Sequence, residues 1–529
     1  MIDRRALLAS GTAALVSTSL AGRRAHAQTR PKSVLKFVPS ANLTVLDPIF
    51  SGAYVSLCHG YAVFDALFGS DASQGVQPQM AEKHSVSDEG LTWTIRLRDG
   101  LRFHDGEPVR AVDCVASLKR WTARQAAGQI VGGFVDGWAA PDDRTIRIAL
   151  KRPMPTLATI MATSVFPPFI MPERLASIDP TKPVTEMIGS GPFRFKADEY
   201  VSGNRVVYER FENYVPRAEP AVWTAGGKIA KVDRIEWHII PDAATAVASL
   251  RRGEIDWLER PIADLLPTLK ADKNVKLGVI DPTGWTGFVR FNQTQAPFDN
   301  QGVRQAVMAA INQEDFLRVA TGDDPDSYTV CKSMFPCGTM FGSQAGAAAM
   351  PGDIAAAKAL LQQSGYAGET AVLLGATDNP PLGDFAELVA DAMRKIGIKV
   401  DLVTTDWGTV TQRRAKREPV SQGGWSAFVS NVNGPAIMNP AVDFLVRGQG
   451  QGGYFGWYEN AEVETLTRAW LEAEDQAERK RIADQIQTIA FKTVPEIPLG
   501  QYVQRTAYRS DVTGILQGPA VLPWNVAKA

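Results

Sequence analysis

The chain has 529 residues, of which 45% are hydrophobic and 21% are charged, and its formal net charge is −1 at pH 7. This composition is typical of a globular protein with two or three domains and a large core. The near-neutral charge argues against a nucleic acid as partner, since such proteins carry a basic face, and it disfavours tight binding to anionic lipid.

The first 27 residues have the pattern of a secretory signal peptide. Arg4-Arg5 precede an apolar run from Ala6 to Ala21, and Ala25-His26-Ala27 has the A-x-A form of a signal-peptidase site. We expect cleavage after Ala27 and a soluble, periplasmic protein. The paired arginines are similar to a twin-arginine export signal, and general secretion stays open as the alternative. The apolar run is shorter than the ~20 residues that span a bilayer, which argues against a membrane anchor.

The first half of the chain predicts strands interrupted by helices and tight turns. Apolar residues alternate at Leu91, Trp93, Ile95 and Leu97, which is the period of a half-buried strand. In chain order we expect a strand at 33–40, a loop at 41–48 leading into a helix, the strand at 91–97, a helix at 110–126, a turn into a strand at 189–195, a strand at 232–240, and a helix followed by a strand at 254–257.

From about residue 285 onward, strands alternate with amphipathic helices. A strand at 288–292 is followed by a helix with one apolar face, and the helices at 353–365 and 386–397 each reach a glycine suited to the left-handed position that ends a helix. A long helix pair at 462–493 precedes a last strand at 495–499. This alternation predicts an α/β fold with a mostly parallel sheet.

Four cysteines remain after removal of the signal. Cys331 and Cys337 flank a short loop-like segment, and in an oxidising compartment we expect a disulfide between them. A metal site is the alternative there, although no histidine or further cysteine is near in sequence. Cys58 and Cys114 lie in apolar helical patterns, so we expect buried free thiols and leave a bridge between them open.

Six segments, taken together and in order, resemble the solute-binding proteins of peptide-type ABC importers, extracellular solute-binding protein family 5. The segments are 97–121, GSGPFRF (189–195), RRGEIDW (251–257), 288–316, DIAAAKALLQQSGY (353–366) and PEIPL (495–499).

The resemblance implies a two-lobed periplasmic binding protein fold of type II, cluster C-like. Lobe I would comprise residues 28–285 plus 500–529, with an inserted subdomain at about 60–185, and lobe II would comprise 286–499. The lobes would close on a peptide or peptide-like solute. The loaded protein, a monomer, would then dock on the membrane permease of an ABC importer.

The resemblance also indicates which residues face the cleft. These are Asn42, Leu43, Tyr54, Trp285, Asn292, Trp407, Trp425, Phe428, Ser430 and Asn433. A place in the core is the alternative for Tyr54, Asn292, Trp407 and Trp425, because aromatic and amide side chains are as common there. For Arg413, Arg414 and Arg417 we expect a solvated helix face rather than an anion site.

The chain departs from the family at one position. Peptide binders carry an Asp that pairs with the ammonium of the peptide, a few residues after a Gly-Trp element, but residues 426–442 contain no Asp or Glu. Because enclosing an ammonium without a counter-charge is costly, either Asp378 or Asp406 supplies the carboxylate or the solute is not a free-amine peptide. We hypothesise that the Asn and Ser groups of 430–433, Asn433 among them, suit a neutral solute such as a sugar, an opine or another neutral compound.

The sequence carries no motif of catalysis. It contains no HExxH, GxSxG or P-loop, and its histidines are isolated. We therefore expect no enzyme, no cofactor and no metal, and in the family the turn at His104 is a surface turn. A secreted hydrolase with an unrecognised site is the alternative from another class, and a receptor or chaperone role on the same scaffold is a third.

Overall fold

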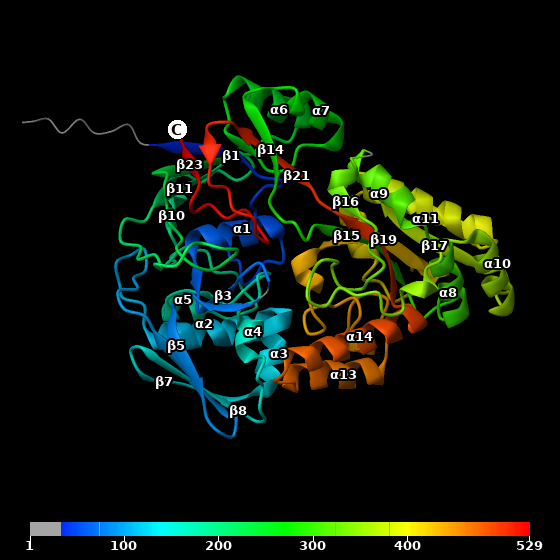
Figure 1. Ribbon diagram of the computed structural model, residues 1–529, viewed down its shortest axis with the longest axis horizontal. Coiled ribbons are helices and arrows are strands. Elements are labelled where there is room, and N and C mark those ends of the chain that lie inside the picture. Colours follow the sequence, from blue (N-terminus) through cyan, green and yellow to red (C-terminus); the bar gives the residue numbers. More distant parts are fainter. Residues whose placement is uncertain (1–32, 74, 323, 380) are drawn as a thin grey trace, which may run out of the picture. The chain divides into compact units, whose positions relative to one another are not determined.

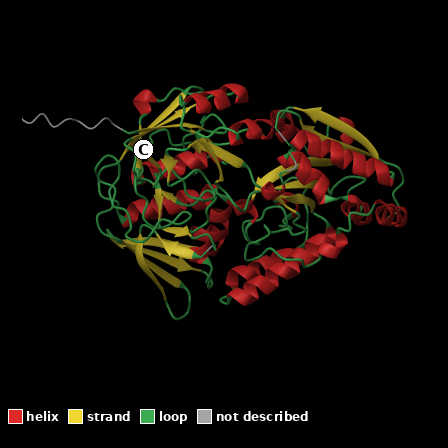
Figure 2. Ribbon diagram, turned by 45° about the horizontal axis from the view of Figure 1, so that its top comes forward, coloured by secondary structure: helices red, strands yellow, loops and turns green. Residues whose placement is uncertain are grey.

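The computed structural model describes residues 33–73, 75–322, 324–379 and 381–529. The predicted signal peptide, residues 1–27, lies outside the described residues. Three principal sheets, of seven, six and four strands, organise the described chain, and helices pack on them (Figures 1 and 2). None of the helices in the described part of the chain combines the length and apolarity needed to span a bilayer.

The seven-stranded sheet combines the beginning, the middle and the end of the chain. Its central strand β1 (Val34–Val38) pairs in parallel with β12 (Arg234–His238) and β13 (Trp257–Leu258). The outer strands are β10 (Phe193–Phe195), β11 (Arg205–Arg210), β21 (Arg505–Arg509) and β14 (Val275–Val279). We call the part of the chain built on this sheet lobe I, with helices α1 (Tyr54–Val63), α6 (Ala243–Arg252) and α7 (Leu266–Lys270).

A four-stranded antiparallel sheet belongs to the same lobe. Its strands are β5 (Ala81–Val86), β6 (Thr92–Leu97), β8 (Thr145–Leu150) and β7 (Val135–Asp142). The alternation predicted for β6 is confirmed, because Trp93, Ile95 and Leu97 are buried between less buried polar residues. The accompanying helices are α2 (Ala111–Arg124), α3 (Ala126–Phe134), α4 (Leu157–Met161) and α5 (Glu173–Ala176).

The six-stranded sheet forms the second part of the chain, which we call lobe II. In order, its strands are β16 (Tyr328–Thr329), β20 (Glu496–Tyr502), β15 (Trp285–Phe291), β19 (Ala427–Asn433), β17 (Thr370–Ala376) and β18 (Lys399–Thr405). The prediction of a mostly parallel sheet is wrong: β17 is parallel to β18 and β19, but β15 is antiparallel to both its neighbours. The period of apolar residues reports which face is buried and carries no information on strand direction.

Five of the seven α-helices in the described part of lobe II follow the predicted elements. They are α8 (Gln301–Ala310), α10 (Ile354–Gln363), α11 (Leu382–Ile396), α13 (Ala461–Glu472) and α14 (Gln476–Thr493), whereas α9 (Gln313–Thr321) was not predicted. Helix α11 packs on β17 and β18 and ends, as predicted, at Gly397 with a left-handed φ of 108°. Figure 1 shows α8, α10 and α11 grouped beside this sheet. The seventh helix, α12 (Trp407–Arg413), follows β18 directly.

Two connections link the lobes, from β14 to β15 and from β20 to β21. They lie side by side at Gly284, where a side chain would place its Cβ 2.4 Å from the carbonyl oxygen of Tyr502. Gly284 also has a φ of 65°, so a glycine is required on both counts. The lobe boundaries at 285 and 499 stay predictions, and these two connections are where the chain crosses.

The predicted cysteine chemistry is confirmed. Cys331 and Cys337 form a disulfide, and Cys58 and Cys114 are buried free thiols. Burial raises the pKa of both thiols well above its ordinary value, so they stay protonated at neutral pH. They act as small apolar groups in the core.

Candidate ligand-binding site

Three of the predicted site residues meet where the lobes join. The guanidinium of Arg260, which follows β13, lies 4.5 Å from the ring centre of Tyr54 and 4.9 Å from that of Trp285. Its Nε is 3.3 Å from a carboxylate oxygen of Glu259, and its side chain is 24% exposed. Because Tyr54 belongs to lobe I and Trp285 begins the first strand of lobe II, this stacked cation bridges the lobes.

Asn433 lies beside this bridge. It is the last residue of β19 and is opposite Trp285 in the strand register. The following residue, Gly434, donates its N–H to the carbonyl of Gly284 at 2.8 Å. The half-buried amide of Asn433 therefore lies at the junction, together with Tyr54 and Trp285.

Five other predicted residues are buried in the protein. These are Leu43, Asn292, Trp425, Phe428 and Ser430. The amide of Asn292 donates to the carbonyl of Trp425 at 3.0 Å and accepts from Thr294, and the indole of Trp425 donates to the carbonyl of Lys416 at 3.1 Å. The polar side chains of Asn292 and Trp425 are thus bonded within the protein. Leu43 lies inside lobe I, and the other four residues lie inside lobe II.

Asn42 is half-buried and is also engaged, because its side-chain oxygen accepts the N–H of Gly203 at 3.0 Å. The loop that it opens is held further by the hydroxyl of Tyr200, which donates to the carbonyl of Leu43 at 2.7 Å. Both bonds tie the loop to the hairpin around β11. The predicted loop is therefore fixed in place before any solute binds.

Trp407 belongs to an aromatic cluster around an arginine. The guanidinium of Arg414 lies 4.8 Å from the ring centre of Phe455, 5.1 Å from that of Trp407, 5.5 Å from Phe428 and 5.9 Å from Tyr454. Its Nη1 donates to the hydroxyl of Tyr454 at 3.2 Å. Cation–π contacts of this kind keep the side chain away from solvent.

The prediction of a solvated helix face is wrong for Arg413 as well as for Arg414. Arg413 donates to the carbonyl of Gly424 at 2.9 Å and so anchors the loop before β19. Only Arg417 is exposed, and its guanidinium still stacks on Trp457 at 4.9 Å. A charge run in sequence does not reveal carbonyls and rings contributed by a distant segment.

The two carboxylates considered as substitutes for the missing Asp both have local partners. Asp378 accepts the N–H of Trp407 at 2.7 Å. Asp406 is the N-cap of α12 and accepts the hydroxyl of Thr409 at 2.5 Å and its N–H at 2.9 Å, two bonds that keep the pKa of this carboxyl below its usual range. Both are exposed beside Trp407.

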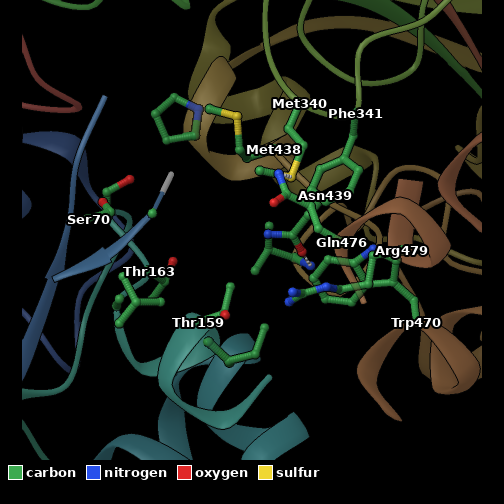
Figure 3. A pocket seen from close by; sticks show the side chains of 17 residues that line it. Ser70, Thr159, Thr163, Met340, Phe341, Met438, Asn439, Trp470, Gln476 and Arg479 are labelled. Carbon is green, nitrogen blue, oxygen red and sulfur yellow. Dashed lines mark hydrogen bonds between the residues drawn. The ribbon is translucent and has the colours of Figure 1, made fainter. Parts of the chain in front are cut away.

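A cavity of about 200 Å³ lies between the lobes, and we call it the interlobe cavity. That volume far exceeds the roughly 10–15 Å³ that one water needs. Figure 3 shows side chains entering it from α4 on one side and from the segment after β19 and helices α13 and α14 on the other. Its lining includes Ser70, Thr159, Thr163 and Ser164 from lobe I, and Met340, Phe341, Met438, Asn439, Trp470, Gln476 and Arg479 from lobe II.

Two donors at the wall of this cavity lack acceptors. Trp470 is 1% exposed, and its indole N–H has no hydrogen-bond partner among the described residues. The buried Nε of Arg479 also has none within the described chain. Burial lowers the pKa of Arg479, and the carboxylate of Asp475 opposes this shift. None of the described residues that line the cavity is an Asp or Glu.

A second hollow, of about 390 Å³, also lies between the lobes, and two ion pairs contribute residues to its wall or lie beside it. Arg447 forms two hydrogen bonds with Glu464, at 2.9 and 2.6 Å. Next to it the lobes touch directly: Thr156 donates its hydroxyl to the carbonyl of Leu471 at 2.6 Å, and Arg152 lies 3.4 Å from Glu472.

The turn at 104–107 lies at the surface as expected, since Asp105, Gly106 and Glu107 are exposed, but the side chain of His104 is buried. It is 7% exposed, its Nε2 lies 3.0 Å from the carbonyl oxygen of Gly191, and burial lowers its pKa to about 4. The neutral ring packs against Phe211. Within the described residues, no group of three or more His, Cys, Asp or Glu side chains is placed to hold a metal ion.

Sequence reasoning did not find the interlobe cavity. None of the ten predicted residues lines it. Arg479 sits in the run Glu478-Arg479-Lys480-Arg481, which is typical of a solvated helix face. The one indication in the sequence is the predicted amphipathic helix pair at 462–493, whose apolar side must pack against another part of the protein.

Two sheet-built lobes that are joined by two adjacent connections and enclose a cavity between them define a two-lobed periplasmic binding protein of the α/β class. The chain belongs to the bacterial extracellular solute-binding proteins, family 5, which it matches over residues 75–441. This is a family of solute-binding proteins and not of enzymes. The predicted family and fold are thereby confirmed.

Among its relatives, a probable peptide ABC transporter periplasmic-binding protein of Sinorhizobium fredii is 39% identical over the full length of both chains. A glutathione-binding protein of Escherichia coli is 27% identical over 96% of each chain. Two solved structures have a TM-score of 0.77 at 22% identity over 94% of this chain: a dipeptide-binding protein from Pseudoalteromonas in complex with Met-Leu, of which 100% is covered, and a binding protein from A. tumefaciens in complex with agropinic acid, of which 99% is covered.

Proposed function

We propose that this chain is the periplasmic solute-binding component of an ABC importer and that it captures a peptide or peptide-like solute between its lobes. The observation that carries the proposal is the interlobe cavity, to which both lobes contribute polar and apolar side chains. Binding sites for small solutes are mostly apolar with a few directed polar groups. The names of the Sinorhizobium and Escherichia relatives support a peptide or a peptide derivative as the solute.

The bridge at the lobe junction forms part of the same proposal. Tyr54, Trp285 and Asn433 would contact the solute or sense closure next to Arg260, and Trp407 would face it from α12. Leu43, Asn292, Trp425, Phe428 and Ser430 are assigned to the supporting wall, because they are buried.

A second candidate is a non-peptide carboxylate solute of the opine type. The observation in its favour is the lack of an Asp or Glu among the described residues that line the cavity, which leaves a free ammonium without a counter-charge there. The solved relative that holds agropinic acid shows that this fold accommodates such a compound.

The test is a ligand screen on the exported protein. The protein is unfolded and refolded to remove carried solute, and its melting temperature is then recorded with di- to pentapeptides, amine-blocked peptides, glutathione, agropinic acid and neutral sugars. A solute present at about 100 times its Kd stabilises by about 2.7 kcal/mol. Stabilisation by peptides supports the proposal, whereas stabilisation by agropinic acid or sugars alone contradicts the peptide part.

Export, assembly and delivery are tested separately. Sequencing of the exported protein is expected to begin at Gln28, after a signal peptide that resembles a twin-arginine signal. Light scattering is expected to show a monomer. Uptake of the bound peptide is expected to require the membrane permease, and uptake that persists without this protein would contradict the importer role.

A further inference from the structure

We propose that Gln487 and the disulfide of lobe II are positioning groups for the interlobe cavity. They hold residues 331–345, which we call the cavity loop, in the shape that presents Met340 and Phe341 to the cavity. This inference rests on the proposed function and adds which groups fix the shape of the site before a solute arrives. Figure 3 shows both side chains at the wall of the cavity that lies opposite α4.

The cavity loop has no regular structure that could hold its shape. Residues 333–345 contain no charged side chain and form neither a helix nor a strand. The loop doubles back on itself: a side chain at Gly342 would place its Cβ 2.4 Å from the carbonyl oxygen of Pro336, and Ser343 donates its N–H to the hydroxyl of Ser333 at 3.3 Å. The polar backbone groups of both arms must therefore find partners elsewhere in the protein.

One amide side chain, that of Gln487 in α14, bonds both arms of the cavity loop. Its Oε1 accepts the hydroxyl of Ser333 at 2.8 Å and the N–H of Met334 at 3.0 Å. Its Nε2 donates to the carbonyl of Ser343 at 3.0 Å and to that of Ala345 at 2.9 Å. Because Gln487 is 0% exposed, water does not compete for these bonds, and loss of the amide would leave polar groups of both arms without their partner.

The disulfide fixes the first arm of the loop. Its two cysteines are six residues apart. Because a disulfide stabilises a fold less when it closes a shorter loop, the main effect of this bond is local. Two further buried glutamines hold the ends of the arm: Gln313 of α9 bonds the N–H and the carbonyl of Cys331, each at 2.8 Å, and Gln501 of β20 accepts the N–H of Cys337 at 2.8 Å. The arm is thus fixed to two elements of lobe II before it reaches the cavity.

The tip of the loop lies between these two arms and forms part of the cavity wall. The sulfur of Met340 accepts the side-chain amide of Gln476 at 3.2 Å, and the ring of Phe341 packs edge-on against Trp470 with centres 5.6 Å apart. All four residues line the cavity, whereas Gln487 does not. Gln487 therefore acts on the cavity through the loop, and a change in its bonds to the two arms should move the tip that they carry.

The positioning role is tested by NMR on the full protein with methyl-¹³C methionine. The methyl signal of Met340, assigned with M340L, should shift in Q487L and in the double variant C331A/C337A, because each removes one of the two proposed groups. Q79L is the matched control: Gln79 is also 0% exposed but lies in lobe I, so its loss should leave the Met340 signal in place. If Q487L does not fold, the double variant decides. A Met340 signal that stays in place in the folded variants, or that moves as far in Q79L, would overturn the inference.

The consequence for the solute is measured by calorimetry with trialanine. A wall that is no longer formed in advance must be ordered when the solute binds, at a cost for each side chain that is fixed. For the two side chains Met340 and Phe341, we expect Q487L to bind trialanine roughly 5- to 100-fold more weakly than the wild type, and Q79L to bind it normally. Equal affinity of Q487L and the wild type would overturn the inference. If trialanine fails to bind the wild type, the peptide proposal falls, and the Met340 signal alone decides the positioning role.

Discussion

Replacement of Asp47 by alanine should destabilise lobe I far more than a surface charge change does. Asp47 ends the loop that carries Asn42 and Leu43. Its Oδ2 lies 2.7 Å from Nη2 of Arg120, and both side chains are 0% exposed. The carboxylate also accepts the N–H groups of Ile49 and Val184, each at 2.9 Å.

The expected loss of unfolding free energy follows from the contacts that Arg120 keeps and loses in D47A. Arg120 keeps its bonds to the carbonyls of Ile178 and Lys182, at 2.8 and 2.7 Å, but loses the only carboxylate paired with it among the described residues. Removal of one partner from a buried pair costs about 3–5 kcal/mol, because the remaining charge is buried without compensation. We therefore expect D47A to lose about that much unfolding free energy, measured by urea denaturation at neutral pH.

The double variant D47A/R120M separates the charge from the packing. If the uncompensated guanidinium causes the loss, R120M should restore part of the stability of D47A, and the interaction energy should exceed about 1 kcal/mol. E82A is the control: Glu82 pairs with Arg96 at 3.1 Å with both side chains nearly half exposed, so the loss should stay below about 1 kcal/mol. Equal losses in D47A and E82A would refute the reasoning.

Two further predictions concern pH and closure. The folded-state pKa of His104 lies at about 4, below the ordinary 6.5, so the contribution of this residue to stability is complete above about pH 6.5 and is lost as the pH falls toward 4. The loss of unfolding free energy, up to about 3 kcal/mol, should be smaller in H104Q. A urea midpoint with the same pH slope in both proteins would contradict this prediction. T156V removes the hydroxyl that donates to Leu471 across the lobes, so trialanine should bind about fivefold more weakly at an unchanged melting temperature, whereas T465V, on the exposed side of α13, should bind it normally.

Local elements could be predicted from the sequence because their causes are local. The buried alternation of Trp93, Ile95 and Leu97 and the left-handed Gly397 each depend on residues within one element. The direction of β15 relative to its neighbours was not predictable in the same way, because it depends on where chain segments more than a hundred residues apart return to the sheet.

The candidate site residues also divide into those whose position the sequence predicts and those whose position it does not. The predicted Tyr54, Trp285 and Asn433 meet at the lobe junction because the family pattern marks the segments around the chain crossings. Asn292 and Trp425 come from equally well-marked segments, yet the amide of Asn292 donates to the carbonyl of Trp425 and the indole of Trp425 donates to the carbonyl of Lys416, both inside lobe II. A segment that faces the cleft still places alternate side chains in the core, and the sequence does not tell which member of the pair points outward.

Residues 426–442 contain no Asp or Glu, and neither does the described lining of the interlobe cavity. Because an enclosed ammonium needs a counter-charge, binding the amine of a peptide inside this cavity would be costly. A free-amine peptide would have to direct its ammonium away from this cavity, for example toward the exposed carboxylates of Asp378 and Asp406 beside Trp407. A solute without an amine would need no such arrangement, so the relative affinity of amine-blocked and free peptides reports directly on how the charge of this site is distributed.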